Sequence, residues 1–157
     1  MAIEKFHGRY FHSLDDKGRV AIPHNFRTIL GGANENRVIL TRSPNANFTY
    51  LDVYPFAEWD AITDRIEQME ISGDESGDLR EALFAHFVHP AQQVELDKQG
   101  RILIPQEHRE FAQIDKEVVY TGDSRKFRLW ARAEWARYQE AMARLRSKLP
   151  AIPRAVR

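Results

Sequence analysis

The sequence predicts an α+β fold made of two tandem β-hairpin–helix repeats. A signature of aspartate, two variable residues, glycine, arginine, three apolar residues and proline occurs twice, at 15–23 and 97–105, 82 positions apart. The tripeptide Ala-Glu-Trp also recurs, at 57–59 and 133–135, 76 positions apart. Two matches at similar offsets indicate a unit duplicated within one chain, so we expect the copies to lie around a pseudo-two-fold axis.

Apolar alternation and turn residues place the strands and helices of each copy. The first copy is expected to contain strands at 9–14 and 19–22 joined by a tight turn. Leu14, Val20 and Ile22 are spaced to share one face of this pair. The proline that ends each signature suits the first position of a helix, where a missing N–H costs nothing. The other expected elements are helices at 24–30 and 106–112, strands at 37–41 and 48–54, and their counterparts at 117–121 and 127–130.

The predicted layout is a single compact unit spanning 1–157. Its parts are a first repeat at 7–54, a helical connection at 55–87, a second repeat at 88–131, a C-terminal helix at 132–149 and a loose tail at 150–157. The connection is expected to hold an amphipathic helix at about 55–71 and a second helix at 79–88. Trp59, Trp130 and Trp135 recur inside amphipathic patterns, which favours core or subunit contacts over base stacking.

Composition limits the functional classes. A chain of 157 residues that is 43% hydrophobic and 29% charged has enough apolar material for one substantial core. No apolar run approaches the roughly 20 residues of a membrane-spanning helix, and residues 1–5 do not lead into a signal peptide, so we expect a cytoplasmic protein with no membrane partner. The absence of cysteine excludes disulfides, thiolate catalysis and sulfur-ligated zinc.

Four residues are expected to form the two turns of the signature. Asp15 and Asp97 can accept backbone N–H bonds, as in Asx turns, while Gly18 and Gly100 allow a backbone conformation that a side chain would penalise. An arginine follows each glycine and points away from the apolar face of its strand. Each arginine is therefore either an outward donor or a partner of the turn aspartate.

Basic residues gather around both turns, including Arg27 in the first copy and Arg109 in the second, although the net charge of the chain is zero. A two-stranded ribbon fits the major groove of DNA, arginine can hold guanine through two hydrogen bonds, and lysine suits phosphate. We therefore predict contacts to double-stranded DNA. The predicted DNA-binding residues are Arg9, Lys17, Arg19, Lys98 and Arg101.

The repeated signature, its spacing, the two prolines and the tryptophan-bearing helices resemble the MraZ family, over about residues 6–138. MraZ proteins are bacterial transcriptional regulators built from two AbrB-like swapped-hairpin motifs. The resemblance implies that the two copies interlock and that subunits close into a ring that binds direct repeats in promoter DNA. It also implies association with the nucleoid and repression of the promoter of the division and cell-wall gene cluster that contains the regulator's own gene. Within this resemblance, Arg19 and Arg101 contact DNA, with Lys17 and Lys98 beside them.

Two other functional classes remain open at this point. Antitoxins use similar hairpins, so the chain could be chiefly a protein-binding module with secondary DNA binding. Alternatively, Asp15 and Asp97 could act as a carboxylate pair in an enzyme, but aspartates that accept several N–H bonds are poor proton donors, and we expect no enzyme. We predict no cofactor and no small-molecule substrate. We also predict no metal site, because His86 and His89 lack an obvious third ligand.

Overall fold

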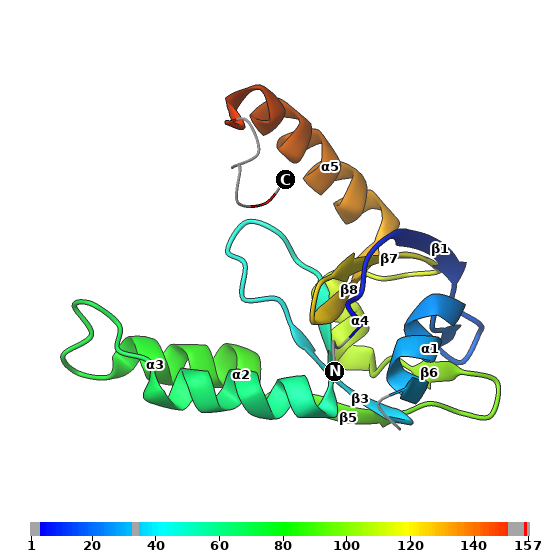
Figure 1. Ribbon diagram of the computed structural model, residues 1–157, viewed down its shortest axis with the longest axis horizontal. Helices are drawn as coiled ribbons and strands as arrows, with labels where there is room; N and C mark the ends of the chain where they lie inside the picture. The colour runs from blue at the N-terminus through cyan, green and yellow to red at the C-terminus, as the bar shows by residue number, and fades with distance from the viewer. Residues whose placement is uncertain (1–3, 33–34, 151–155, 157) are drawn as a thin grey trace.

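The computed structural model describes residues 4–32, 35–150 and 156 (Figure 1). The elements of the first copy and of the connection are β1 (Arg9–Ser13), β2 (Arg19–Ala21), α1 (His24–Gly32), β3 (Arg37–Arg42), β4 (Leu51–Pro55), α2 (Phe56–Gln68), α3 (Asp78–Leu83) and a short π-helix, η1 (Phe84–Val88). Those of the second copy are β5 (Gln92–Glu95), β6 (Arg101–Leu103), α4 (Gln106–Ala112), β7 (Glu117–Asp123), β8 (Lys126–Ala131), α5 (Arg132–Leu145) and the 3₁₀ helix η2 (Arg146–Lys148). The predicted α+β fold with two hairpin–helix repeats is confirmed.

The main sheet has a palindromic strand order. In the described part of the chain it contains six antiparallel strands in the order β1-β7-β8-β4-β3-β5. Each copy therefore contributes two neighbouring strands to the centre of the sheet, β3 and β4 from the first copy and β7 and β8 from the second. The first strand of each copy lies at the edge of the sheet, paired with a strand of the other copy: β1 with β7, and β5 with β3. Asp52 lies opposite Arg128 in the central β4–β8 pair, and these residues occupy equivalent positions 76 apart. The pseudo-two-fold axis thus passes through the middle of this pair.

The signature strands pair between copies. β2 forms a separate antiparallel pair with β6, in which Val20 lies opposite its equivalent Ile102. The local hairpin that the apolar pattern suggests is limited to the turn, where Asp15 N donates to Arg19 O. Reciprocal bonds tie the turns together, because Ile22 N donates to Gly100 O and Ile104 N donates to Gly18 O, both at 3.0 Å. This exchange of strands is the interlocking that the family resemblance implies.

The core lies between this small ribbon and the main sheet. Val20, Ile22, Ile102 and Ile104 are each at most 1% exposed, as the alternation predicts. They pack with Phe26 and other apolar side chains of both copies in one cluster. Full burial of an aliphatic side chain contributes about 1.5–3 kcal/mol, so this shared cluster stabilises the contact between the two copies.

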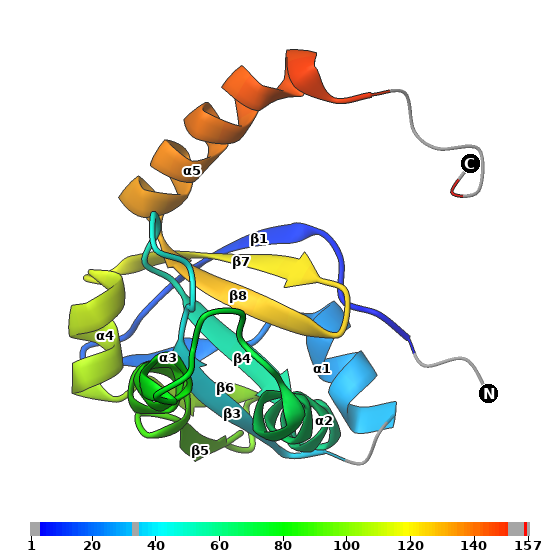
Figure 2. The same cartoon turned by 90° about the vertical axis from the view of Figure 1, so that its left-hand side faces the viewer.

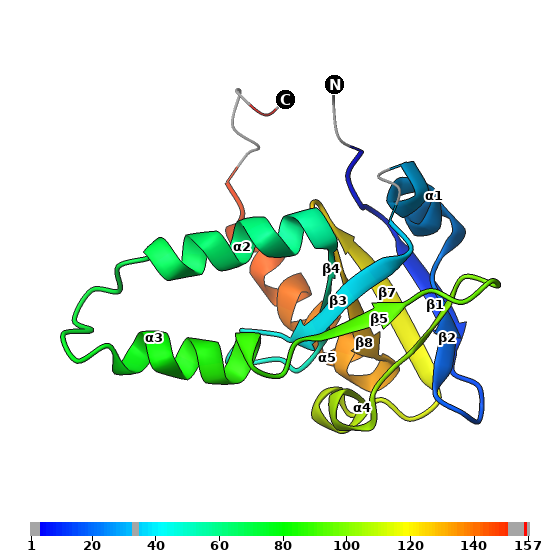
Figure 3. The ribbon, with the colours of Figure 1, turned by 90° about the horizontal axis from the view of Figure 1, so that it is seen from below.

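The helices differ from the predictions mainly at their ends. Pro105 precedes α4 as its capping residue and is not the first helical residue. α2 ends at Gln68, earlier than the predicted 71, and the predicted helix at 79–88 continues from α3 into a π-helix. α2 and α3 lie side by side and project from the sheet (Figures 1 and 3). α5 projects from the sheet in a different direction, away from α2 and α3 (Figure 2).

Two further observations bear on the predictions for the ends of the chain. In the part that the structure describes, no helix is long and apolar enough to cross a membrane. The predicted loose tail at 150–157 lies outside the described residues except for Pro150 and Val156.

Candidate nucleic-acid interface

The first signature turn is held together by one carboxylate. Oδ1 of Asp15 accepts bonds from the backbone N–H groups of Lys17 and Arg19, both at 2.9 Å. Oδ2 of Asp15 accepts a bond from Nε of Arg19 at 2.8 Å. Gly18 has a φ of +83°, in the left-handed region that a side chain disfavours. The turn therefore fixes both its own shape and the direction of the following arginine.

The second turn repeats this geometry. Asp97 accepts from the backbone N–H groups of Gln99 and Arg101 and from Nε of Arg101, all at 2.9 Å. Gly100 has a φ of +76°. The sequence left two roles open for each arginine, and the structure combines them, because each is paired with its aspartate and still about one-third exposed.

These bonds shift the titration of both aspartates. The backbone N–H of Arg19, aided by its guanidinium, lowers the pKa of Asp15 to about 2. The backbone N–H and guanidinium of Arg101 lower the pKa of Asp97 in the same way. Both groups are ionised near neutral pH and committed to their own turns. The arrangement therefore favours a structural role over the acid–base chemistry of a catalytic pair.

The two arginines lie on one face of the β2–β6 ribbon. Arg19 is opposite Leu103 and Arg101 is opposite Ala21, so both alternate with the buried residues of their strands. One guanidinium nitrogen of Arg101 is 3.7 Å from Oδ2 of Asp15. The two signature turns thus form one continuous polar surface, which we name the ribbon face: Asp15, Arg19, Asp97, Arg101 and the turn residues between them.

A second pair of arginines, Arg27 and Arg109, packs against the glycines of the two turns. Arg27 packs so closely against Gly100 that a Cβ atom on this glycine would lie 2.4 Å from Cδ of Arg27. Arg109, the equivalent of Arg27 in the second copy, packs against Gly18. Nε of Arg27 donates to Ile22 O at 3.0 Å. The sequence showed these arginines as part of a basic group, but their position behind the opposite turn depends on the strand exchange.

The other predicted DNA-binding residues are distributed unevenly. Lys17 and Lys98 are both exposed within the turns, at different positions, since Lys17 corresponds to Gln99 and Lys98 to Asp16. Arg9 lies at the far end of β1, with its guanidinium carbon 5.9 Å from the centre of the Trp135 ring. The structure therefore brings Lys17, Lys98, Arg19 and Arg101 together and leaves Arg9 apart from them.

The remaining polar groups offer little for a bound ion. Across residues 4–32, 35–150 and 156, no cluster of three or more His, Asp or Glu side chains is placed to hold a metal. His86 instead makes a 2.8 Å hydrogen bond from Nε2 to the backbone oxygen of Ser43. The ribbon face is thus the principal candidate site.

Comparison with known proteins identifies the family. A family model described as "MraZ protein, putative antitoxin-like" matches residues 6–81 and 87–151. Proteins named transcriptional regulator MraZ are 38% identical over 133 residues in Desulfitobacterium hafniense and 39% identical over 134 residues in Pelotomaculum thermopropionicum, each covering 85% of both chains. One from Roseiflexus is 37% identical over 137 residues, which is 87% of this chain and 88% of the relative. The chain belongs to the MraZ family of transcriptional regulators.

Proposed function

We propose that this protein is a sequence-specific DNA-binding regulator that contacts promoter DNA through the ribbon face. Subunits assemble into a ring that offers several such faces to direct repeats. The target is the promoter of the division and cell-wall gene cluster that includes the protein's own gene, and binding represses it. The bound protein is associated with the nucleoid.

One observation carries this proposal: Arg19 and Arg101 share an exposed face, and each is held in place by an aspartate of its own turn. A two-stranded ribbon fits into the major groove, where a guanidinium can donate two bonds to guanine. Because the aspartates fix the arginines before binding, little side-chain entropy is lost on contact. The exposed Lys17 and Lys98 are suited to the flanking phosphates.

Zero net charge is compatible with DNA binding when several faces act together. One ribbon face carries few cations, so a single contact would be weak and salt-sensitive. Linked faces that engage successive repeats raise the overall affinity without new contacts. Specific binding then depends on assembly and on the spacing of the repeats.

The test is a gel-shift titration with DNA from upstream of the protein's own gene. Arg19→Ala and Arg101→Ala should each weaken binding at least tenfold while the fold persists, since a surface arginine contributes little to stability. Arg125→Ala is the matched control, because Arg125 is exposed beyond the far end of β7. Undiminished affinity in both ribbon variants would contradict the proposal. A stoichiometric partner protein bound in place of promoter DNA would instead support the antitoxin-like alternative.

A further inference from the structure

Two arginines outside the ribbon face occupy equivalent positions in the two copies. Arg27 lies in α1, four residues after Pro23, and Arg109 lies in α4, four residues after Pro105. Each contacts the signature turn of the opposite copy. The proposed function gives these contacts no part in DNA binding, although they adjoin the residues that carry it.

The side chain of Arg27 fills the space beside Gly100. A Cβ atom on Gly100 would lie less than 3.0 Å from Cδ, Nε and Nη1 of Arg27, closer than real Cβ atoms approach other groups. Nε of Arg27 donates to Ile22 O at 3.0 Å. Ile22 N donates in turn to Gly100 O, also at 3.0 Å. These three residues thus form a closed set of contacts between the two copies.

Arg109 makes the equivalent contact with the first turn. A Cβ atom on Gly18 would lie 3.0 Å from Cζ and 3.1 Å from Nη1 of Arg109, so the guanidinium rests on this glycine. Nε of Arg109 is buried and has no hydrogen-bond partner among the described residues. Arg109 therefore lacks the bond that fixes Arg27, and we expect it to hold its turn less firmly.

The glycine under each arginine controls the geometry of its turn. The N–H of Gly100 donates to the backbone oxygen of Asp97 at 3.0 Å. The next residue, Arg101, bonds the Asp97 carboxylate through its backbone N–H and its Nε, both at 2.9 Å. A displacement of Gly100 would therefore move the Arg101 guanidinium relative to Asp97. The first turn is built in the same way around Gly18.

We infer that Arg27 and Arg109 are positioning residues for DNA binding, each holding the other copy's turn in the shape that presents its arginine. Arg27 acts through the second turn on Arg101. Arg109 acts through the first turn on Arg19. The inference rests on the proposed function and adds to it that each DNA contact depends on both copies of the repeat.

A positioning role and a direct contact have different consequences. A cation that meets a phosphate displaces a counterion, so its removal lowers both the affinity and the salt dependence of binding. A positioning residue changes the affinity and leaves the salt dependence as it was. Its effect also disappears when the group that it positions is removed, because two residues that act as a unit are not additive.

The first test measures hydrogen exchange by mass spectrometry in the full chain without DNA. Arg27→Ala should accelerate exchange about threefold or more at 97–101 and leave 15–19 nearly unchanged. Arg109→Ala should do the reverse, so each variant is the matched control for the other. Both arginines are partly exposed, and circular dichroism should show a preserved fold. If Arg27→Ala does not fold, Arg27→Lys, which lacks the Nε donor, should still accelerate exchange at 97–101.

The second test is a gel-shift titration with DNA from upstream of the protein's own gene, at several salt concentrations. Arg27→Ala should weaken binding by about threefold or more without changing the salt slope. Added to Arg101→Ala, it should weaken binding by less than about twofold, because the guanidinium that it positions is absent. Added to Arg19→Ala, it should keep its full effect.

Any of three results would overturn the inference. Exchange could change equally in both turns or in neither, or the effects of Arg27→Ala and Arg101→Ala on affinity could simply add. The salt slope could also fall by about one per bound subunit in Arg27→Ala, which would make Arg27 a phosphate contact. Weakened binding in Arg19→Ala and Arg101→Ala alongside any of these results would preserve the proposed function. Undiminished binding in those two variants would contradict the proposed function, and the positioning role would fall with it.

Discussion

Each signature aspartate satisfies three donors of its own turn, and this has a consequence for stability in acid. The pKa of Asp15 is lowered to about 2 from its ordinary value of 3.8, chiefly by the backbone N–H of Arg19. A carboxyl group whose pKa is lower in the folded chain contributes its stabilisation fully above about pH 4 and loses it as the pH falls toward 2. The pKa of Asp97 is shifted in the same direction.

We therefore predict that both turns weaken between about pH 4 and pH 2. Urea midpoints should fall across this range, and Asp15→Asn should reduce the size of the fall because one titrating group is gone. The matched control is Asp16→Asn, next to Asp15 in the same exposed turn. An equal pH dependence in Asp15→Asn and the unaltered chain would show that the carboxylate does not bind its turn as described.

Sequence reasoning at this scale found the residues of the turns but not all of their neighbours. Asp15, Gly18 and Arg19 follow from a local pattern, because an Asx turn needs only adjacent residues. Arg27 was visible only as one of several basic residues near the first signature. Its contact with Gly100 crosses between copies, and local spacing carries no information about it.

Among the secondary-structure elements, the strands and helices were predictable and their partners were not. Alternation identifies the buried face of β2, since Val20 and Ile22 must lie on one side. Alternation does not show whether β2 pairs with a neighbouring strand of its own copy or with the equivalent strand of the other copy, β6, because either pairing would bury Val20 and Ile22 equally well. The family resemblance, and not the periodicity, supplied the exchange of strands.

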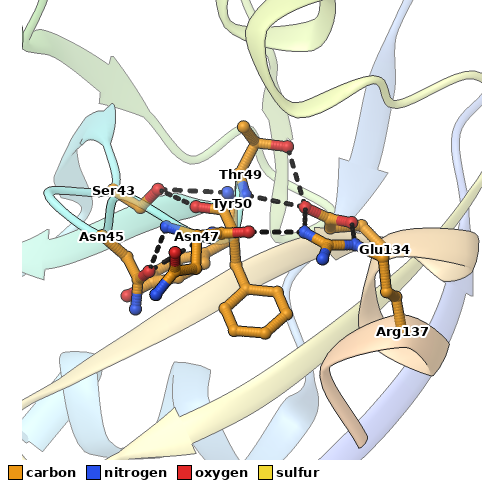
Figure 4. Close-up of polar contacts among 8 residues, drawn as sticks. Ser43, Asn45, Asn47, Thr49, Tyr50, Glu134 and Arg137 are labelled. Atoms are coloured by element: carbon orange, nitrogen blue, oxygen red, sulfur yellow. Dashed lines mark hydrogen bonds and ion pairs between the residues drawn. The ribbon is translucent and has the colours of Figure 1, made fainter. Parts of the chain in front are cut away.

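The attachment of α5 gives a prediction at the scale of elements. The Glu134 side chain is 12% exposed and accepts hydrogen bonds from Thr49 and Arg137 (Figure 4). The Glu140 side chain is 69% exposed and, among the described residues, pairs with Arg144 alone. Glu134→Gln should lower the free energy of unfolding by about 1 kcal/mol, because a charge-assisted acceptor is weakened. Glu140→Gln should change it by less than about 0.5 kcal/mol. Urea denaturation measures both values.

Hydrogen exchange provides a second measurement of the contact between Glu134 and the β3–β4 loop. Exchange should accelerate in the first turns of α5 in Glu134→Gln, because the weakened bonds hold these turns less firmly to the β3–β4 loop. If the two glutamate variants behave alike in both measurements, α5 is positioned by packing alone.

Over the whole molecule, the palindromic sheet follows from duplication. The repeat in the sequence predicted a pseudo-two-fold axis, and the central pairing of Asp52 with Arg128 lies on it. The symmetry does not extend to the surroundings of the two Ala-Glu-Trp helices, because η1 covers α2, whereas Met142 and Leu145 of α5 are 37% and 46% exposed. This asymmetry depends on the segments that connect the repeats, so the repeat pattern could not predict it.

The central claim is that the two turns act together as one DNA-binding surface. The most direct test is the salt dependence of binding to DNA from upstream of the protein's own gene, compared among the unaltered chain, Arg19→Ala, Arg101→Ala and the Arg125→Ala control. If both arginines meet DNA, each substitution should lower the affinity, and any phosphate contact it removes should reduce the salt slope by about one per bound subunit. Arg125→Ala should change neither quantity. Unchanged affinity and slope in either ribbon variant would contradict the claim that both copies bind DNA.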